Sequence, residues 1–124
     1  KLVKVLPVSI GAHTTLMNEC SDILRKLLNN MSNNFENILF PIIHNVDGNQ
    51  HLSADDTVDA LCKQVNSPVL WTKTIEHIKQ MNITNFVEIG PGNVLSGLNK
   101  RIANDITTMS ISNYENINDA LEMN

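Results

Sequence analysis

Short β-branched runs alternate along this 124-residue chain with longer stretches whose apolar residues recur every three or four positions. Such runs are typical of buried strands, and such stretches are typical of amphipathic helices. We expect strands at 2–8, 38–43, 86–89 and 106–111, and helices at 15–29, from 53 onward, from 67 onward, after 92 and at 115–123. This alternation predicts an α/β fold, with a parallel sheet and flanking helices.

Cap and turn residues mark where several of these elements begin. Ser53, with Asp56 three residues later, has the spacing of a helix-capping box. Ser67-Pro68 offers a capping hydroxyl and a first-turn proline to the next helix. Gly90-Pro-Gly92 lies between a strand and a helix, but it matches neither the dinucleotide fingerprint nor a P-loop. We therefore interpret it as a tight turn rather than as an anion site.

The helical periodicity also predicts which residues face the core. The expected inward residues are Leu16, Cys20, Ile23, Leu24, Leu27, Leu28 and Met31 in the first helix, Val58, Leu61, Cys62 and Val65 in the second, Trp71, Ile75 and Ile78 in the third, and Val94, Leu95, Leu98 and Ile102 in the fourth. Both cysteines belong to these faces, so we interpret them as buried free thiols. Free thiols suit a reducing compartment, which favours the cytoplasm.

Charge and hydropathy exclude two classes of partner. The net charge is −4 and the isoelectric point is about 5.4, so no basic field invites nucleic acid. No apolar run approaches the roughly 20 residues that a membrane-spanning helix requires. We therefore expect a globular protein that binds neither nucleic acid nor membrane.

His13 is the candidate catalytic residue. It follows a break at Gly11 and lies between the first predicted strand and the first predicted helix, where reacting groups are often placed. Imidazole titrates near neutral pH, which suits a general base. The alternative is a histidine that only caps or packs the start of the helix, and composition and spacing alone leave both interpretations open.

The other histidines give no clear chemistry. His44 and His51 are loosely spaced, without a carboxylate at ligand spacing, so we predict no metal site. His77 is expected on the outer face of its helix. The chain has no Gly-x-Ser-x-Gly elbow, so His13 has no evident nucleophile within these residues.

Three ordered motifs resemble one enzyme family. They are Leu6-Pro-Val-Ser9 with His13 and Leu16-Met17, then Gln64-Val-Asn-Ser-Pro-Val-Leu-Trp71, then Glu88-Ile-Gly-Pro-Gly-Asn-Val-Leu-Ser-Gly-Leu-Asn-Lys-Arg-Ile102. Asn45-Val-Asp47 fits between the first two. Together they resemble the C-terminal part of malonyl-CoA:acyl carrier protein transacylase of the bacterial fatty-acid synthesis type, and the likeness covers essentially the whole chain.

The resemblance implies a fold and its boundaries. The family has an α/β-hydrolase-like large subdomain with an inserted ferredoxin-like small subdomain. Residues 1–9 would then be the end of the small subdomain, which is its last strand. Residues 10–124 would be the C-terminal part of the large acyltransferase subdomain.

The resemblance also implies a reaction. In this family a serine takes malonyl from malonyl-CoA and then passes it to acyl carrier protein in a ping-pong mechanism. His13 matches the histidine that acts as general base and acid, and Gln64 matches the residue whose backbone carbonyl orients that histidine. The reaction requires no cofactor and no metal.

Two departures from the family pattern leave alternatives open. The serine, the oxyanion-hole residues and the malonyl-binding arginine belong to an N-terminal part that is missing from this sequence, so the chain alone is expected to be inactive. Gly11-Ala12 stands where relatives often carry a bulkier or hydroxylated residue, which leaves the extender unit undecided. The alternatives are an acyltransferase segment of a polyketide synthase and a non-catalytic remnant or binding module. The end of the chain soon after a final helix favours the stand-alone enzyme.

Overall fold

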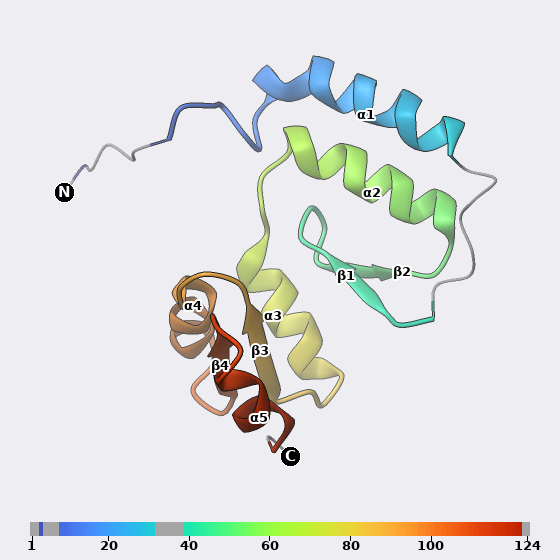
Figure 1. The fold of residues 1–124 in the computed structure, drawn as a ribbon. Helices are drawn as coiled ribbons and strands as arrows, with labels where there is room; N and C mark the ends of the chain where they lie inside the picture. The colour runs from blue at the N-terminus through green and yellow to red at the C-terminus, as the bar shows by residue number, and fades with distance from the viewer. Residues whose placement is uncertain (1–2, 4–7, 32–38, 123–124) are drawn as a thin grey trace. The chain divides into compact units, whose positions relative to one another are not determined.

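The computed structural model describes residue 3, residues 8–31 and residues 39–122. The chain divides into two compact units, Lys1–Leu70 and Trp71–Asn124, and each is described by itself (Figure 1). The strand expected at 2–8 lies almost entirely outside the described residues, as does most of the segment 1–9 assigned to the small subdomain. That boundary stays a prediction.

Two helices of 13 residues each lie side by side in the first unit. The 3-10 turn η1 (Thr15–Met17) leads into α1 (Asn18–Asn30), which lies beside α2 (Ala54–Asn66) (Figure 1). Thr14 caps the turn, because its hydroxyl oxygen accepts the Leu16 backbone N–H at 3.3 Å. The predicted first helix is therefore confirmed, with its first turn wound as a 3-10 helix.

A short hairpin replaces the strand expected at 38–43. Strand β1 (Ile42–His44) pairs antiparallel with β2 (Asn49–His51), and β2 was not predicted. The turn between them is closed by Gly48, whose N–H donates to the His44 carbonyl at 2.7 Å and whose φ is +66°. Strand β2 consists of three polar residues, so it lacks the apolar alternation that would predict a strand. Its pairing with β1 across the turn makes it a strand.

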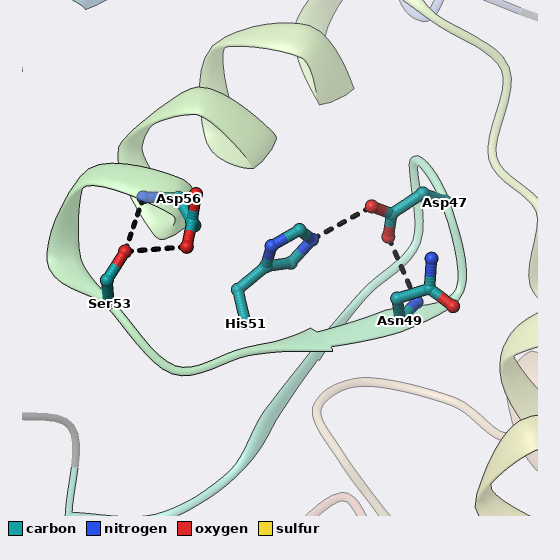
Figure 2. Close-up of polar contacts among 5 residues, drawn as sticks. All are labelled: Asp47, Asn49, His51, Ser53 and Asp56. Atoms are coloured by element: carbon teal, nitrogen blue, oxygen red, sulfur yellow. Dashed lines mark hydrogen bonds and ion pairs between the residues drawn. The ribbon is translucent and has the colours of Figure 1, made fainter.

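The start of α2 is set by its predicted cap. The Ser53 hydroxyl accepts the Asp56 backbone N–H at 3.0 Å and donates to the Asp56 carboxylate at 2.7 Å (Figure 2). Helix α3 (Trp71–Gln80), however, does not begin at Ser67 as predicted. Ser67 is extended and ends α2, because Pro68 disfavours helical geometry in the residue before it.

Burial agrees with the prediction for one cysteine and not for the other. Cys62 is completely buried in α2, together with Val58 and Ala60. Cys20 is exposed, so its predicted burial is wrong. The neighbouring Ser21 is the buried residue of α1, because the Ser21 side turns toward α2.

The second unit contains the predicted parallel pairing. Strands β3 (Asn85–Ile89) and β4 (Thr107–Ile111) are parallel, in register from Asn85 opposite Thr107 to Ile89 opposite Ile111. Helix α4 (Val94–Ile102) connects them, and α5 (Asn116–Leu121) follows β4 (Figure 1). The α/β character predicted from the alternation of elements is thus confirmed.

The inward face of α4 differs from the predicted one. Val94 is 71% exposed, and Leu95 and Leu98 are also exposed, whereas the buried residues are Ser96 and Asn99. Polar partners explain the difference, because Ser96 bonds to Ser110 on β4 at 2.9 Å. The apolar periodicity of α4 therefore does not mark its buried face, and hydrogen bonds hold the polar face of the helix inward.

The glycine turn before α4 agrees with its interpretation as a turn. Gly90 and Gly92 have φ values of +145° and +88°, which favour glycine. The first free amides of the helix are occupied by the Glu88 carboxylate, which accepts from Leu95 N at 3.1 Å and from Ser96 N at 2.8 Å. Hydrogen bonding from Ser96 N is the main cause that lowers the pKa of Glu88.

Candidate functional site

The candidate base His13 occupies a tight turn ahead of α1. The Thr14 hydroxyl donates to the Gly11 carbonyl at 2.7 Å and closes the turn around the histidine. His13 itself has φ +61°, the left-handed region that costs an L-residue about 1–2 kcal/mol. Strained residues of this kind persist where the surrounding contacts fix them.

Those contacts come from the C-terminal turn of α2. The His13 ring nitrogen Nδ1 lies 2.8 Å from the Gln64 carbonyl oxygen, and the His13 backbone N–H donates to the Val65 carbonyl at 3.0 Å. Carbonyls in the last turn of a helix lack an intrahelical partner, so they are free to accept these bonds. The structure therefore brings together the two residues that the resemblance paired.

The Gln64 contact decides which ring nitrogen carries the proton. A carbonyl oxygen can only accept, so Nδ1 of a neutral His13 must be the donor. The lone pair of the neutral ring is then on Nε2, which is the form a general base requires. The His13 side chain is exposed, so a reacting group can reach it.

An open hollow of about 280 Å³ lies beside this histidine. It is lined by His13, Leu24, Leu28, Leu61, Gln64 and Val65. Four of the six lining residues are aliphatic, and no lysine or arginine is among them. The hollow is thus an apolar surface next to the base, without a cation that would bind a carboxylate.

The hairpin holds a second polar cluster that the sequence did not predict. His51 Nε2 lies 2.8 Å from Asp47 Oδ2, and Asp47 Oδ1 accepts the Asn49 backbone N–H at 2.9 Å (Figure 2). The His44 and His51 rings meet edge to face, 5.2 Å between centroids. The turn folds Asp47 back onto His51, a pairing four residues apart that the sequence interpretation did not include.

Burial shapes the titration of this cluster. Burial lowers the pKa of His44, and the nearby His51 lowers it further. His44 is 4% exposed, and its buried Nε2 has no hydrogen-bond partner among residues 3, 8–31 and 39–122. Burial raises the pKa of Asp47, but hydrogen bonds from Asn49 and His51 outweigh it and leave the pKa below its usual value.

Three further findings concern the described residues. Within residues 3, 8–31 and 39–122, no three histidine, cysteine or acidic side chains are grouped so that they could hold a metal ion. Among the same residues, no helix is both long enough and apolar enough to cross a membrane. His77, expected to be solvated, is half-buried.

Sequence reasoning missed the polar contacts that join α1 to α2. Ser21 Oγ donates to the Cys62 carbonyl at 2.7 Å, Asn66 Nδ2 donates to Asn18 Oδ1 at 2.9 Å, and Arg25 pairs with Asp59. The Arg25 hydrogen bond is the main cause that lowers the pKa of Asp59. Each contact spans more than thirty residues, so no local spacing marks it. The one local signal is Ser21, a polar residue within the apolar stripe of its helix, which indicates a buried hydrogen bond.

Comparison with characterised proteins finds malonyl transacylases that are similar to this chain over almost its whole length. No family model matches. The Malonyl CoA-acyl carrier protein transacylase of Escherichia coli K12 is 35% identical over 118 residues, which is 95% of this chain and 38% of the relative. The enzyme of the same name from Staphylococcus aureus COL is 30% identical over 116 residues. This chain spans a little over a third of the length of these relatives.

Solved structures agree with the sequence comparison. The malonyl CoA-acyl carrier protein transacylase of Coxiella burnetii superposes with a TM-score of 0.88 at 36% identity, covering 98% of this chain and 38% of that one. The complex of a type II PKS acyl-carrier protein with its malonyl-transacylase superposes with a TM-score of 0.87 at 37% identity, covering 94% of this chain and 37% of that one. The matched part is their C-terminal segment, so the resemblance predicted from three motifs is confirmed.

Proposed function

We propose that this chain, a homologue of the C-terminal segment of malonyl-CoA:acyl carrier protein transacylases, supplies the general base of such an enzyme. The remaining part of the enzyme supplies the serine that carries the malonyl group. The substrates are malonyl-CoA and acyl carrier protein, in cytoplasmic fatty-acid synthesis. The observation that carries the proposal is the 2.8 Å contact between His13 Nδ1 and the Gln64 carbonyl.

The proton transfers follow from that contact. His13 Nε2 takes the proton of the serine hydroxyl as its oxygen attacks the thioester carbonyl of malonyl-CoA. The same nitrogen returns a proton to the leaving coenzyme A thiolate. In the second half-reaction His13 deprotonates the phosphopantetheine thiol, which attacks the malonyl-serine ester, and the serine oxygen recovers the proton.

The Gln64 carbonyl has an electrostatic role in these steps. A protonated His13 keeps its Nδ1–H donor, so the carbonyl oxygen stabilises the imidazolium as it forms. Each step moves only a proton and an acyl group, so the proposal includes neither metal nor cofactor. The fold proposed with this function is α/β-hydrolase-like, with residues 1–9 ending a ferredoxin-like subdomain and residues 10–124 in the large subdomain.

The test is malonyl transfer by the complete enzyme carrying single substitutions. His13→Ala removes the proton acceptor, and loss of a general base typically lowers kcat about 10²–10⁴-fold. Gln64→Ala should lower it far less, because the orienting carbonyl belongs to the backbone and survives the substitution. Equal and small losses in the two variants would reduce His13 to a structural residue.

A second measurement separates the enzyme from a non-catalytic remnant. This chain alone, incubated with radiolabelled malonyl-CoA, should gain no ester-linked label, because a base without its nucleophile forms no acyl-enzyme. The complete protein should gain stoichiometric label. A complete protein that stays unlabelled would favour the remnant, and label on the chain alone would reveal an unrecognised nucleophile.

A further inference from the structure

His13 and the carbonyl that orients it belong to different segments. His13 precedes α1, whereas Gln64 lies in the last turn of α2. The 2.8 Å distance between them therefore depends on how α1 is held along α2. Hydrogen bonds weaken steeply as their geometry departs from the ideal, so a small slip of one helix would release the ring.

One contact between these helices is buried. Ser21 is 7% exposed, and its hydroxyl donates to the Cys62 carbonyl at 2.7 Å, two residues before Gln64. Cys62 is fully buried, so the bond is shielded from water. A serine hydroxyl within a helix commonly bonds to its own preceding turn, but here it bonds to a second helix.

The other polar contacts between α1 and α2 within the described residues are exposed. Asn66 donates to Asn18, and Arg25 pairs with Asp59, where both side chains are well solvated. Exposed pairs of this kind contribute little, because water competes for them. The Ser21 bond is therefore the polar contact best able to fix the position of α1 on α2.

We propose that Ser21 is a positioning residue for the transfer reaction, holding α1 against the C-terminal turn of α2 so that His13 Nδ1 meets the Gln64 carbonyl. This inference rests on the proposed function of His13. Ser21 contacts neither substrate nor reacting atoms in this arrangement. Its effect on the reaction passes entirely through His13.

The coupling between Ser21 and His13 can be measured. A misplacement of about 1 Å at a reacting group can cost 10²-fold in rate, so a partial slip after Ser21→Ala should lower kcat by about tenfold. KM for malonyl-CoA should stay within about twofold, because the substitution leaves binding groups in place. Ser21→Thr retains the hydroxyl and should recover most of the rate.

The decisive experiment is a double-mutant cycle in the complete enzyme. Ser21→Ala is combined with His13→Ala, and kcat is measured for wild type, both single variants and the double variant. If Ser21 acts through His13, its substitution should change kcat by less than about twofold once His13 is absent. A full tenfold loss in both backgrounds would show a general structural role and overturn the inference.

Ser96→Ala is the matched control. Ser96 is also 7% exposed and also bonds through its hydroxyl, but to Ser110 on β4. Its effect on kcat should be the same with and without His13. An unchanged kcat in Ser21→Ala overturns the positioning role alone, whereas a small loss in His13→Ala overturns the proposed function itself.

Discussion

The Nδ1 atom of His13 lies 2.8 Å from the main-chain oxygen of Gln64, although 51 residues separate the two in sequence. Since the acceptor is a carbonyl, it fixes the tautomer without adding a charge to the site. A carboxylate in the same place would bind the imidazolium more strongly and hold its proton. The main-chain oxygen thus orients the ring without placing a second charge beside it.

The tautomer itself can be measured. In the folded protein at a pH where His13 is neutral, we expect its proton on Nδ1 and its lone pair on Nε2. Long-range proton–nitrogen NMR with labelled histidine distinguishes the two ring nitrogens. Gln64→Ala should leave the pattern unchanged, whereas a neutral His13 with its proton on Nε2 would contradict the assigned geometry.

The cap of α2 gives a stability prediction. Ser53 satisfies the Asp56 N–H at 3.0 Å, so Ser53→Ala should lower the free energy of unfolding by about 1 kcal/mol. Ser53→Gly should lower the free energy of unfolding by only a few tenths of a kcal/mol, because glycine tolerates the capping position. Chemical denaturation measures both, and an alanine variant as stable as wild type would show that the cap contributes nothing.

Local signals in the sequence predicted much of this fold. Ser53 with Asp56 specified a helix start, and Gly90-Pro-Gly92 specified the turn between β3 and α4. Such signals act within a few residues, where backbone geometry and hydrogen bonding are decided by the residues themselves. The parallel pairing of β3 with β4 followed from their alternation with helices.

What the sequence did not predict depends on distant partners. The buried face of α4 was assigned to its apolar residues, but Glu88 and Ser110 supply hydrogen bonds that turn Ser96 inward. The left-handed conformation of His13 was likewise not predicted, because a positive φ is uncommon for residues other than glycine. Gln64 could be paired with His13 only through the family resemblance.

The hairpin cluster predicts a dependence of stability on pH in two steps. The fold favours neutral His44, so the unfolded chain takes up a proton near pH 6.5 before the folded chain does. The stability that is present above pH 6.5 should therefore decline as the pH falls through the lower pKa that His44 has in the folded protein. The fold favours ionised Asp47, so a second decline of stability should begin near the ordinary pKa of an aspartate, 3.8.

Two variants separate these steps in equilibrium unfolding measured across pH. His44→Leu removes the titrating group and its unpartnered Nε2, so the first decline should flatten. Asp47→Asn should reduce the second decline and keep the first. An unaltered profile in His44→Leu would assign the loss of stability near pH 6 to other groups.

The polar inward face of α4 leads to the last prediction. The indole N–H of Trp71 donates to the Asn99 side-chain oxygen at 2.9 Å, and Asn99 is 4% exposed. Asn99→Ala leaves this part-buried donor without its acceptor, which should lower the free energy of unfolding by about 1–3 kcal/mol. Trp71 is the only tryptophan in the sequence, so its fluorescence reports on this contact directly.

The control for Asn99 is an asparagine of the same region that is open to solvent. Asn104 lies just beyond the end of α4 and is exposed, so Asn104→Ala should change stability by less than about 0.5 kcal/mol. In Asn99→Ala the emission maximum of Trp71 should also shift, because the indole loses a fixed polar neighbour. If the two variants unfolded at the same denaturant concentration with the same emission, the bond between Trp71 and Asn99 would not hold α4 in its observed orientation.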